Sequence, residues 1–537
     1  MERPKGPVVL CLLDGIGEPE HEDNPVSRSA TPTLDRLRRE GAFTQLGASG
    51  PAVGLREGQP GRGDHGYLTL GAGRVLSPRS RDIDEAVAQE RLGRNPTIDR
   101  TFDRAAYFDR RVHLIGLIGG DNHAQMSHLF ALLDLAEFHG VKVWLHAILD
   151  GRDGRPRTAA PLLDKIETYL GDNGRIATIG GRHWAMDRAG RWDRVHAMVH
   201  AMVRDNALGP EAPRAETPWS ALAEGYARGE DDGTIKPVRI GDYQGFDGTF
   251  VGEFSDQSGR MGWEWRSEDW GLAFNQRGDG MEMLSSMLTL QGVPEDVQRD
   301  LLEDLDKPIR AFSEGRYAAL TDHGEHLDLH VAYDHPVVED TLADVIARAG
   351  LRQFRCAEAE RRWHVGRYFR GGRRELHADE REAIIRSPQL IDRYEEEPEL
   401  SLAKVEAAVL AALADNDFVT LSLPNASLVS QEGPSDAAER AIAAMDATLG
   451  RVAEAVQEAG GVLLVTAPHG GCETPTDDEG EPRRGHSRAA VPLAVLGGDI
   501  RALRAGGSLV DVAPTILALL GLEAPAAMTG RSLIAED

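Results

Sequence analysis

The sequence predicts an α/β protein with two domains, and three observations carry this prediction. The apolar run Val8–Leu13 ends in Asp14 and Gly15, which is the pattern of a buried parallel strand. Short apolar runs alternate with segments of helical periodicity in the middle of the chain and again in its last third. A chain of 537 residues is too long for one hydrophobic core, so we expect two domains, either in succession or with one inserted in the other.

Composition narrows the class of protein. The net charge is −27, from 60 Lys and Arg against 87 Asp and Glu, which argues against nucleic-acid and anionic-membrane partners. Cys11, Cys356 and Cys472 are widely spaced and form no CxxC motif, so neither a disulfide framework nor a structural zinc site is indicated. No run of eighteen apolar residues occurs. We therefore expect a soluble, cytoplasmic protein.

The first domain begins with two features that point to a site. Asp14 follows the strand Val8–Leu13, at the end of a parallel strand where ligands bind, although an Asp-Gly turn is also common without any function. The glycine-rich stretch Leu55–Arg74 predicts a tight loop whose backbone approaches a charged group. Gly63 is expected at the tip of this loop. No Ser, Thr or Cys that could act as a nucleophile lies between Leu55 and Leu68.

The middle of the chain predicts a second α/β unit. Strands are expected at 113–118, 141–149 and 175–179, with a helix at 127–139. Polar residues follow each strand, so these strand ends are expected to line one cleft. The segment GRHWAMDRAGRWDR crowds arginines next to apolar residues, which suits a phosphate or carboxylate ligand; the alternative is a solvated, arginine-rich helix face.

The last third returns to α/β alternation. It predicts strands at 418–423, 462–466 and 491–496 and a terminal helix at 510–520. A long helix from Asp436 to Gly460 should turn one apolar face inward, formed by Ile442, Met445, Leu449, Val452 and Val456. His469 follows the second of these strands, and His486 precedes the third.

Several blocks, in this order, resemble the cofactor-independent (2,3-bisphosphoglycerate-independent) phosphoglycerate mutases of the alkaline-phosphatase-like superfamily. Among them are LLDGIG, ATPTLDRL, HAILDGRD, GRHWAMDRAGRW and DVAPTILALLGLEAPAAMTGRSL. The resemblance implies an alkaline-phosphatase-like sheet sandwiched by helices, with a second α/β domain inserted. It places the phosphatase-like domain at 1–78 and 329–537 and the substrate-binding domain at 79–328. In that family a Ser nucleophile carries the phosphoryl group and two divalent cations, manganese or magnesium, assist it.

The chain departs from the family at most of the positions that would carry catalysis. The family's nucleophile loop, like GNSEVGH, reads GRGDHGY here, so Gly63 stands at the Ser position. One metal would then have Asp14, Gly63, Pro468 and His469, and the other Ser427, Gln431 and His486. Of these, only Asp14, His469 and His486 keep the family's ligand, and they belong to different metals. We expect no cofactor, or Mn²⁺ or Mg²⁺ if the chain is active; a single relocated metal on the three survivors is the alternative.

The substrate-binding positions are better kept. The resemblance assigns this role to His123, Arg152, Asp153, Arg182, Arg188, Arg277 and Arg361. Arg361 stands where the family has Lys, and Gly280 replaces a second Arg. The chain is therefore predicted to be a catalytically degenerate mutase homologue that still binds phosphoglycerate or a similar small, anionic, phosphorylated metabolite. The alternative is an active glycolytic mutase that interconverts 3- and 2-phosphoglycerate through a rearranged metal site. Protein partners are left open.

Overall fold

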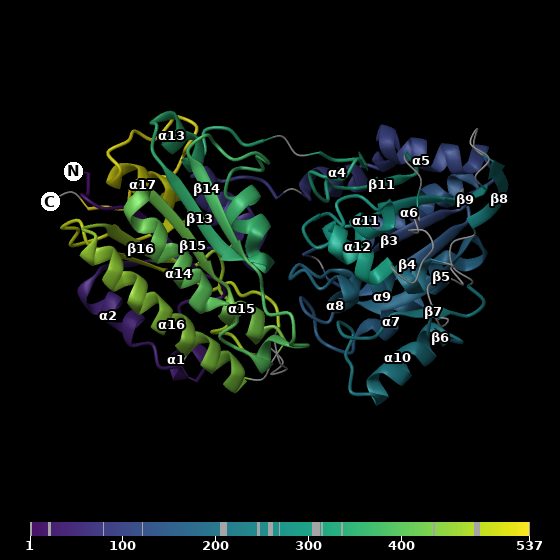
Figure 1. Cartoon of the computed structure of the whole chain (residues 1–537), viewed down its shortest axis with the longest axis horizontal. Helices are drawn as coiled ribbons and strands as arrows, with labels where there is room; N and C mark the ends of the chain where they lie inside the picture. Colours follow the sequence, from purple (N-terminus) through teal and green to yellow (C-terminus); the bar gives the residue numbers. More distant parts are fainter. Residues whose placement is uncertain are drawn as a thin grey trace. The chain divides into compact units, whose positions relative to one another are not determined.

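The chain folds into two compact units, each of which is described by itself (Figure 1). Unit 1 comprises Met1–Pro78 and Pro336–Asp537, and unit 2 comprises Arg79–His335. The structure, a computed structural model, describes all residues except 1–2, 20–22, 79, 121, 204–211, 244–247, 256–260, 268, 303–311, 313–314, 335–336, 433–434, 477–483 and 536–537. No helix in this described part of the chain is both long and apolar enough to cross a membrane.

Unit 1 is built on a mostly parallel sheet with the strand order β14-β13-β15-β1-β16-β17-β2-β18. The central strand β1 (Val8–Leu13) pairs in parallel with β15 (Phe418–Leu423) and with β16 (Val462–Thr466). All six residues of β1 are fully buried, as a strand covered on both faces requires. Both the N-terminal strand and the strands of the last third lie where the apolar runs predicted them, and Asp14 therefore stands at the carboxyl edge of the sheet.

The remaining strands of unit 1 complete the two edges of this sheet. On one side, β13 (Gln353–Glu358) and β14 (Glu380–Ile385) extend the parallel part. On the other side, β17 (Val491–Leu496) runs antiparallel to both β16 and β2 (Ala42–Gly47), and the short β18 (Gly507–Ser508) closes the edge. The sheet is thus assembled from both sequence segments of the unit.

Helices flank the sheet of unit 1. The long α16 (Ser435–Glu458) packs against α1 (Pro25–Arg28), α2 (Pro32–Glu40), α14 (Leu402–Ala412) and α15 (Asn425–Ser430) (Figure 1). Its expected inward face is buried throughout, from Ile442 to Val456. A second group of helices comprises α3 (Gly63–Ala72), α13 (Leu342–Arg348) and α17 (Val512–Leu519), which contact one another.

The glycine-rich stretch is only partly the loop that its composition predicts, because Gly63–Ala72 forms the helix α3. Two of its glycines explain the composition. A Cβ on Gly71 would lie 1.9 Å from the carbonyl oxygen of Phe369, and a Cβ on Gly66 would lie 2.3 Å from that of Pro468. These glycines therefore allow the helix to pack closely against other backbone segments. The sequence predicted a loop whose backbone approaches a charged group, whereas the structure shows a helix whose glycines approach backbone carbonyl groups.

Unit 2 has its own sheet, with the strand order β12-β11-β10-β3-β4-β5-β7-β6. Its parallel centre is formed by β3 (Val112–Ile118), β4 (Val143–Leu149) and β5 (Gly174–Gly181), and α6 (Met126–His139) connects the first two. The strand β10 (Trp270–Ala273) pairs with β3 and with β11 (Tyr317–Ala319). Because β12 (His330–Val331) pairs with β11, this unit continues past residue 328, where the sequence placed its end.

Candidate functional site

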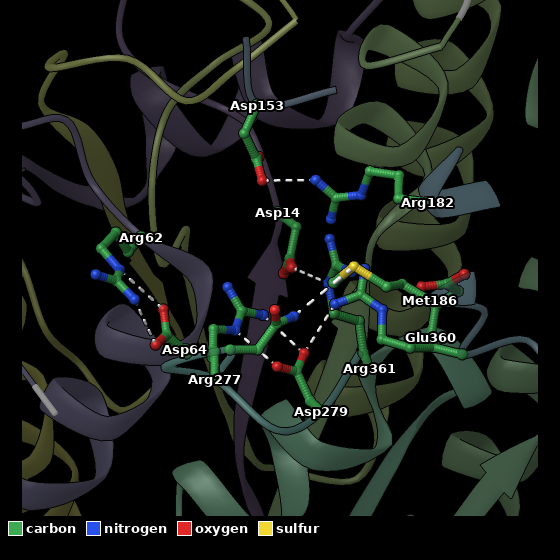
Figure 2. Close-up of polar contacts among 12 residues, drawn as sticks. Asp14, Arg62, Asp64, Asp153, Arg182, Met186, Arg277, Asp279, Glu360 and Arg361 are labelled. Carbon is green, nitrogen blue, oxygen red and sulfur yellow. Dashed lines mark hydrogen bonds and ion pairs between the residues drawn. The ribbon is translucent and has the colours of Figure 1, made fainter. Parts of the chain in front are cut away.

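Asp14 is the centre of a buried polar cluster in unit 1. One of its carboxylate oxygens, Oδ1, accepts hydrogen bonds from the hydroxyl groups of Tyr67, at 2.6 Å, and Ser422, at 3.3 Å. The other, Oδ2, accepts from the Nε of Arg361 at 2.5 Å (Figure 2). Four elements meet here, since β1 leads into Asp14, α3 carries Tyr67, β15 carries Ser422, and the segment after β13 carries Arg361. Both carboxylate oxygens are therefore engaged by donors of the protein.

The electrostatics of the cluster follow from this pairing. Burial raises the pKa of the Tyr67 hydroxyl well above its usual value, and the neighbouring Asp14 carboxylate adds to the rise. Burial alone would lower the pKa of Arg361, but the Asp14 carboxylate more than compensates and raises it. The cluster is therefore an ion pair of Asp14⁻ and Arg361⁺ with a neutral phenol hydrogen-bonded to it.

Gly63, where the family resemblance places the nucleophile, is the first residue of α3. A Cβ placed on it would lie 3.2 Å from Nε2 of His364 and 3.7 Å from Nε2 of His469. His364 begins a turn of π-helix, His364–Tyr368, and its ring contacts the ring of Tyr67 edge-on at 5.3 Å. The sequence analysis did not single out His364, which no motif or spacing had marked.

The two expected metal-binding histidines lie together. The rings of His469 and His486 stack at 3.7 Å, and Nδ1 of each ring lies within hydrogen-bond distance of a backbone carbonyl, that of Gly470 or Gly61. Apart from Asp14, the other expected positions hold no ionised ligand. Gln431 donates to the hydroxyl of Ser427 at 3.3 Å, and Pro468 has no donor atom in its side chain.

One further carboxylate, that of Glu473, lies in this region, but it accepts hydrogen bonds from backbone amides. Its Oε2 accepts from the amides of Gly17, at 2.9 Å, and Gly471, at 2.8 Å, while Oε1 accepts from the hydroxyl of Ser487. Within the described residues, no group of three His, Cys, Asp or Glu side chains is arranged to hold a metal ion. The side chains at the family's two metal positions therefore do not fit the two cations that the family resemblance implies.

Unit 2 gathers the other set of predicted site residues at the carboxyl ends of its strands. Arg182, after β5, donates to Asp153 at 2.7 Å and also to Asp150, both after β4 (Figure 2). Arg277, after β10, binds Asp279 through two hydrogen bonds of 2.7 Å, and Arg188 donates to the same carboxylate at 2.9 Å. Arg152 lies in the same loop as Asp153. Sequence reasoning did not single out Asp279, although the R-x-D spacing to Arg277 was visible.

His123 stands between these ion pairs. Its side chain is buried, and burial together with the charges of Arg277 and Arg182 holds the pKa of the imidazole well below its usual value. Its Nδ1 has no hydrogen-bond partner among the residues described. Burial alone would raise the pKa of the Asp279 carboxyl, but Arg277 and Arg188 lower it strongly. A neutral imidazole among several guanidinium groups is an environment that suits an oxyanion.

The position of the missing second arginine is filled from within unit 2. A Cβ on Gly280 would lie 2.7 Å from the methyl group of Met186 and 3.6 Å from Cε1 of His123. The sulfur of Met186 in turn lies 3.9 Å from the amide nitrogen of Asn275. A thioether thus packs where the family resemblance places a guanidinium. Arg191 and Arg194 from the same crowded segment pair with Asp193 and Asp187 instead.

The chain is similar in sequence to a known family of proteins over its whole length. Residues 83–307 match the family model described as BPG-independent PGAM N-terminus. The chain is 34% identical to a 2,3-bisphosphoglycerate-independent phosphoglycerate mutase of Methanosarcina acetivorans, over 100% of both chains, and 35% identical to that of Myxococcus xanthus, over 99% of both.

A solved structure gives the same result for the fold. The structure of phosphoglycerate mutase from Leishmania mexicana, determined at low cobalt concentration, superposes with a TM-score of 0.86 at 23% identity, covering 100% of this chain and 98% of the other. The expected α/β fold with a second α/β domain is thereby confirmed. With full-length relatives at this level of identity, the chain belongs to the family of 2,3-bisphosphoglycerate-independent phosphoglycerate mutases.

Proposed function

We propose that this chain is a catalytically degenerate phosphoglycerate mutase homologue that binds phosphoglycerate or a similar anionic, phosphorylated metabolite without converting it. The observation that carries the proposal is the state of Asp14. Its carboxylate, which the family resemblance assigns to a metal, is held by Arg361, Tyr67 and Ser422. A carboxylate already paired with a guanidinium has little to gain from a cation.

The nucleophile position supports loss of turnover independently. Gly63 has no side chain, and the adjacent residue that the sequence offers to replace the missing hydroxyl is Asp64, with its carboxylate. That carboxylate is paired with Arg62, with distances of 3.3 and 3.1 Å to Nε and one terminal nitrogen. Removal of a nucleophile and its partners lowers turnover by up to about a million-fold in well-studied enzymes.

The arginines of unit 2 support retained binding. Arg182, Arg188 and Arg277 are largely buried, and with Arg152 they provide more positive charge than Asp150, Asp153 and Asp279 offset. Buried guanidinium groups in such an arrangement favour a phosphate or carboxylate group. The relatives named above are phosphoglycerate mutases, so a phosphoglycerate is the first ligand to test. We place this binding role in the cytoplasm, since all three cysteines are buried free thiols. The proposed ligand, a phosphoglycerate, is an intermediate of glycolysis.

The test separates turnover from binding. The purified chain is incubated with 3-phosphoglycerate and excess Mn²⁺, and formation of 2-phosphoglycerate is followed by phosphorus NMR without coupling enzymes. We expect no conversion. In parallel, 3-phosphoglycerate should raise the melting temperature of the wild type, and the shift should be lost in Arg182→Gln and Arg188→Gln. The control is Arg81→Gln, which removes an exposed arginine from the same unit.

Two results would overturn the proposal. Conversion that disappears in Asp14→Ala or His469→Ala would establish an active mutase with a rebuilt metal site. A melting temperature that does not respond to 3-phosphoglycerate, 2-phosphoglycerate or inorganic phosphate would remove the binding role.

A further inference from the structure

A short turn, residues 231–235, lies against the ends of two neighbouring strands of unit 2, β4 and β5. The turn is held in one conformation by its own hydrogen bonds. The amides of Thr234 and Ile235 donate to the carbonyl of Asp231, at 3.0 and 2.9 Å. The Thr234 hydroxyl donates to the carboxylate of Asp231 at 2.9 Å and accepts from the Asp231 amide at 2.9 Å. These bonds make the turn a fixed support for the segments that contact it.

Asp232 joins this turn to the helix α7 (Ala159–Leu170). Its side chain is buried, and its Oδ2 accepts from the amides of Thr158, at 2.7 Å, and Ala159, at 3.1 Å. Its Oδ1 accepts from the hydroxyl of Tyr226. The first amides of a helix have no partner within the helix, and an unmatched buried amide is costly. Asp232 therefore fixes the start of α7, which is also the end of the loop that follows β4.

Gly233 places the same turn against both strand ends. A Cβ on Gly151, after β4, would lie 2.4 Å from the amide nitrogen of Gly233. A Cβ on Gly181, the last residue of β5, would lie 2.1 Å from the carbonyl oxygen of Gly233, and this carbonyl accepts from the amide of His183 at 3.0 Å. The backbone of the turn thus lies directly against the start of the loop after β4 and against the end of β5.

The segments held in this way carry charged groups of the candidate site. Arg152 and Asp153 lie in the loop of residues 150–158, which the turn contacts at both ends. Arg182 follows β5 and donates to Asp153 and to Asp150 (Figure 2). The position of the loop relative to β5 therefore decides whether this guanidinium meets its two carboxylates. It also decides which way the rest of its planar fork faces.

We propose that Asp232 is a positioning residue of the arginine cluster of unit 2, which keeps the loop after β4 in register with Arg182 for an anionic ligand. Asp232 acts through this loop and not on the ligand, since its two oxygens already accept three hydrogen bonds. The role in binding rests on the proposed function. The placement of the loop by Asp232 does not, and it can be measured without a ligand.

Hydrogen exchange followed by mass spectrometry tests the placement in the ligand-free, full-length chain. Asp232→Ala should accelerate exchange about tenfold in peptides that cover residues 150–158 and 181–184, because the cap of α7 is lost. Asp446→Ala is the matched control. Asp446 is also buried, and it accepts from two consecutive amides at the start of α2, in unit 1, both at 2.9 Å. This control should leave exchange in the two peptides unchanged.

A milder variant guards against misfolding of Asp232→Ala. Tyr226→Phe keeps the carboxylate and removes only its third hydrogen bond. It should accelerate exchange in the same two peptides, by a smaller factor. Unchanged exchange in both variants, or equal acceleration in Asp446→Ala, would overturn the proposal.

Titration calorimetry with 3-phosphoglycerate tests the consequence for binding. Asp232→Ala should weaken binding about tenfold, whereas Asp232→Asn should stay within about threefold of the wild type, since asparagine caps a helix as well as aspartate. An equal loss in both would assign the effect to the charge of Asp232 and overturn its positioning role. A wild type that does not bind 3-phosphoglycerate would contradict the proposed function, and hydrogen exchange would still decide whether Asp232 places the loop.

Discussion

The imidazole rings of His469 and His486 lie face to face, with 3.7 Å between their centroids and 16° between their planes. Each ring also places Nδ1 against a backbone carbonyl, which leaves Nε2 as its one possible ligand atom. Among the described residues, however, no group of three His, Cys, Asp or Glu side chains is arranged to complete a metal site. We therefore expect Mn²⁺ and EDTA to leave the melting temperature unchanged. A metal bound at a hundred times its dissociation constant would add about 2.7 kcal/mol to the free energy of unfolding, which calorimetry detects as a rise of several degrees. Such a rise, if abolished by His469→Ala, would contradict this expectation.

Restoring the missing hydroxyl should not restore catalysis. In Gly63→Ser the new Cβ would lie 3.2 Å from Nε2 of His364, so the histidine must move to admit it. We expect no turnover of 3-phosphoglycerate and a fall in the free energy of unfolding of about 1 kcal/mol, typical of mild overpacking. Gly63→Ala is the matched control, because it adds the same Cβ without the hydroxyl. Metal-dependent conversion in Gly63→Ser, with none in Gly63→Ala, would show that the hydroxyl is the only part missing.

Glu358, at the end of β13, makes stability depend on pH near neutrality. Burial raises the pKa of its carboxyl from 4.5 to about 7, although the amide of Ser401 donates to it at 2.8 Å. The folded chain therefore binds this proton more tightly than the unfolded chain, and stability falls as pH rises from 4.5 to 7 and then levels off. The loss amounts to about 3 kcal/mol.

Urea unfolding at several pH values tests this dependence. Glu358→Gln keeps an oxygen that can accept from Ser401 but carries no titrating proton. The difference in unfolding free energy between the variant and the wild type should grow in favour of the variant between pH 4.5 and 7. A constant difference across that range would mean that Glu358 does not titrate there.

Glu380, on β14, has a lowered pKa, so its contribution to stability depends on pH in the opposite direction to that of Glu358. Arg355 and Arg370 both donate to its Oε1. Burial alone would raise the pKa of Glu380, but the two arginines outweigh it and lower the pKa from 4.5 to about 2. The stabilisation is thus present above pH 4.5 and is lost as pH falls towards 2.

Glu380→Gln should be strongly destabilising at pH 7, because two buried guanidinium groups lose their shared counter-charge. Denaturant unfolding is expected to show a loss of about 3 to 5 kcal/mol. The control is Glu382→Gln, which removes a more exposed partner of Arg370 and should change stability by less than about 1 kcal/mol. Equal effects of the two substitutions would argue against a special role for Glu380.

The sequence predicted the strands well, but it predicted only some of the contacts between the site residues. Val8–Leu13 and Phe418–Leu423 are continuous apolar runs, and burial on both faces leaves no other interpretation. The stretch around Gly63 was harder, because glycines chosen for contact between backbones resemble glycines chosen for a turn. The spacing of apolar residues predicts which side chains are buried. It does not reveal which backbone segment, distant in the sequence, packs against a given helix.

The pairing of Asp14 with Arg361 lay beyond sequence reasoning for a different reason. The two residues are 347 positions apart, and each had a separate expected role, one in metal binding and one in substrate binding. Only the parallel packing of β13, β15 and β1 brings the segment after β13 to the end of β1. The sequence contains 60 Lys and Arg and 87 Asp and Glu residues, so each acidic residue has many possible basic partners, and only the fold determines which two side chains form an ion pair.

Under the proposed function, the ion pair between Asp14 and Arg361 also makes a loss of metal binding hard to reverse by single steps. Replacing Arg361 alone leaves a buried carboxylate without its counter-charge. Replacing Pro468 alone changes the backbone segment against which Gly66 packs, and any side chain at Gly63 crowds His364. Each reversion is unfavourable until the others are in place. If the chain has lost metal-dependent turnover as proposed, the packing of this centre prevents that turnover from returning one substitution at a time, while the anion-binding residues of unit 2 remain free to change.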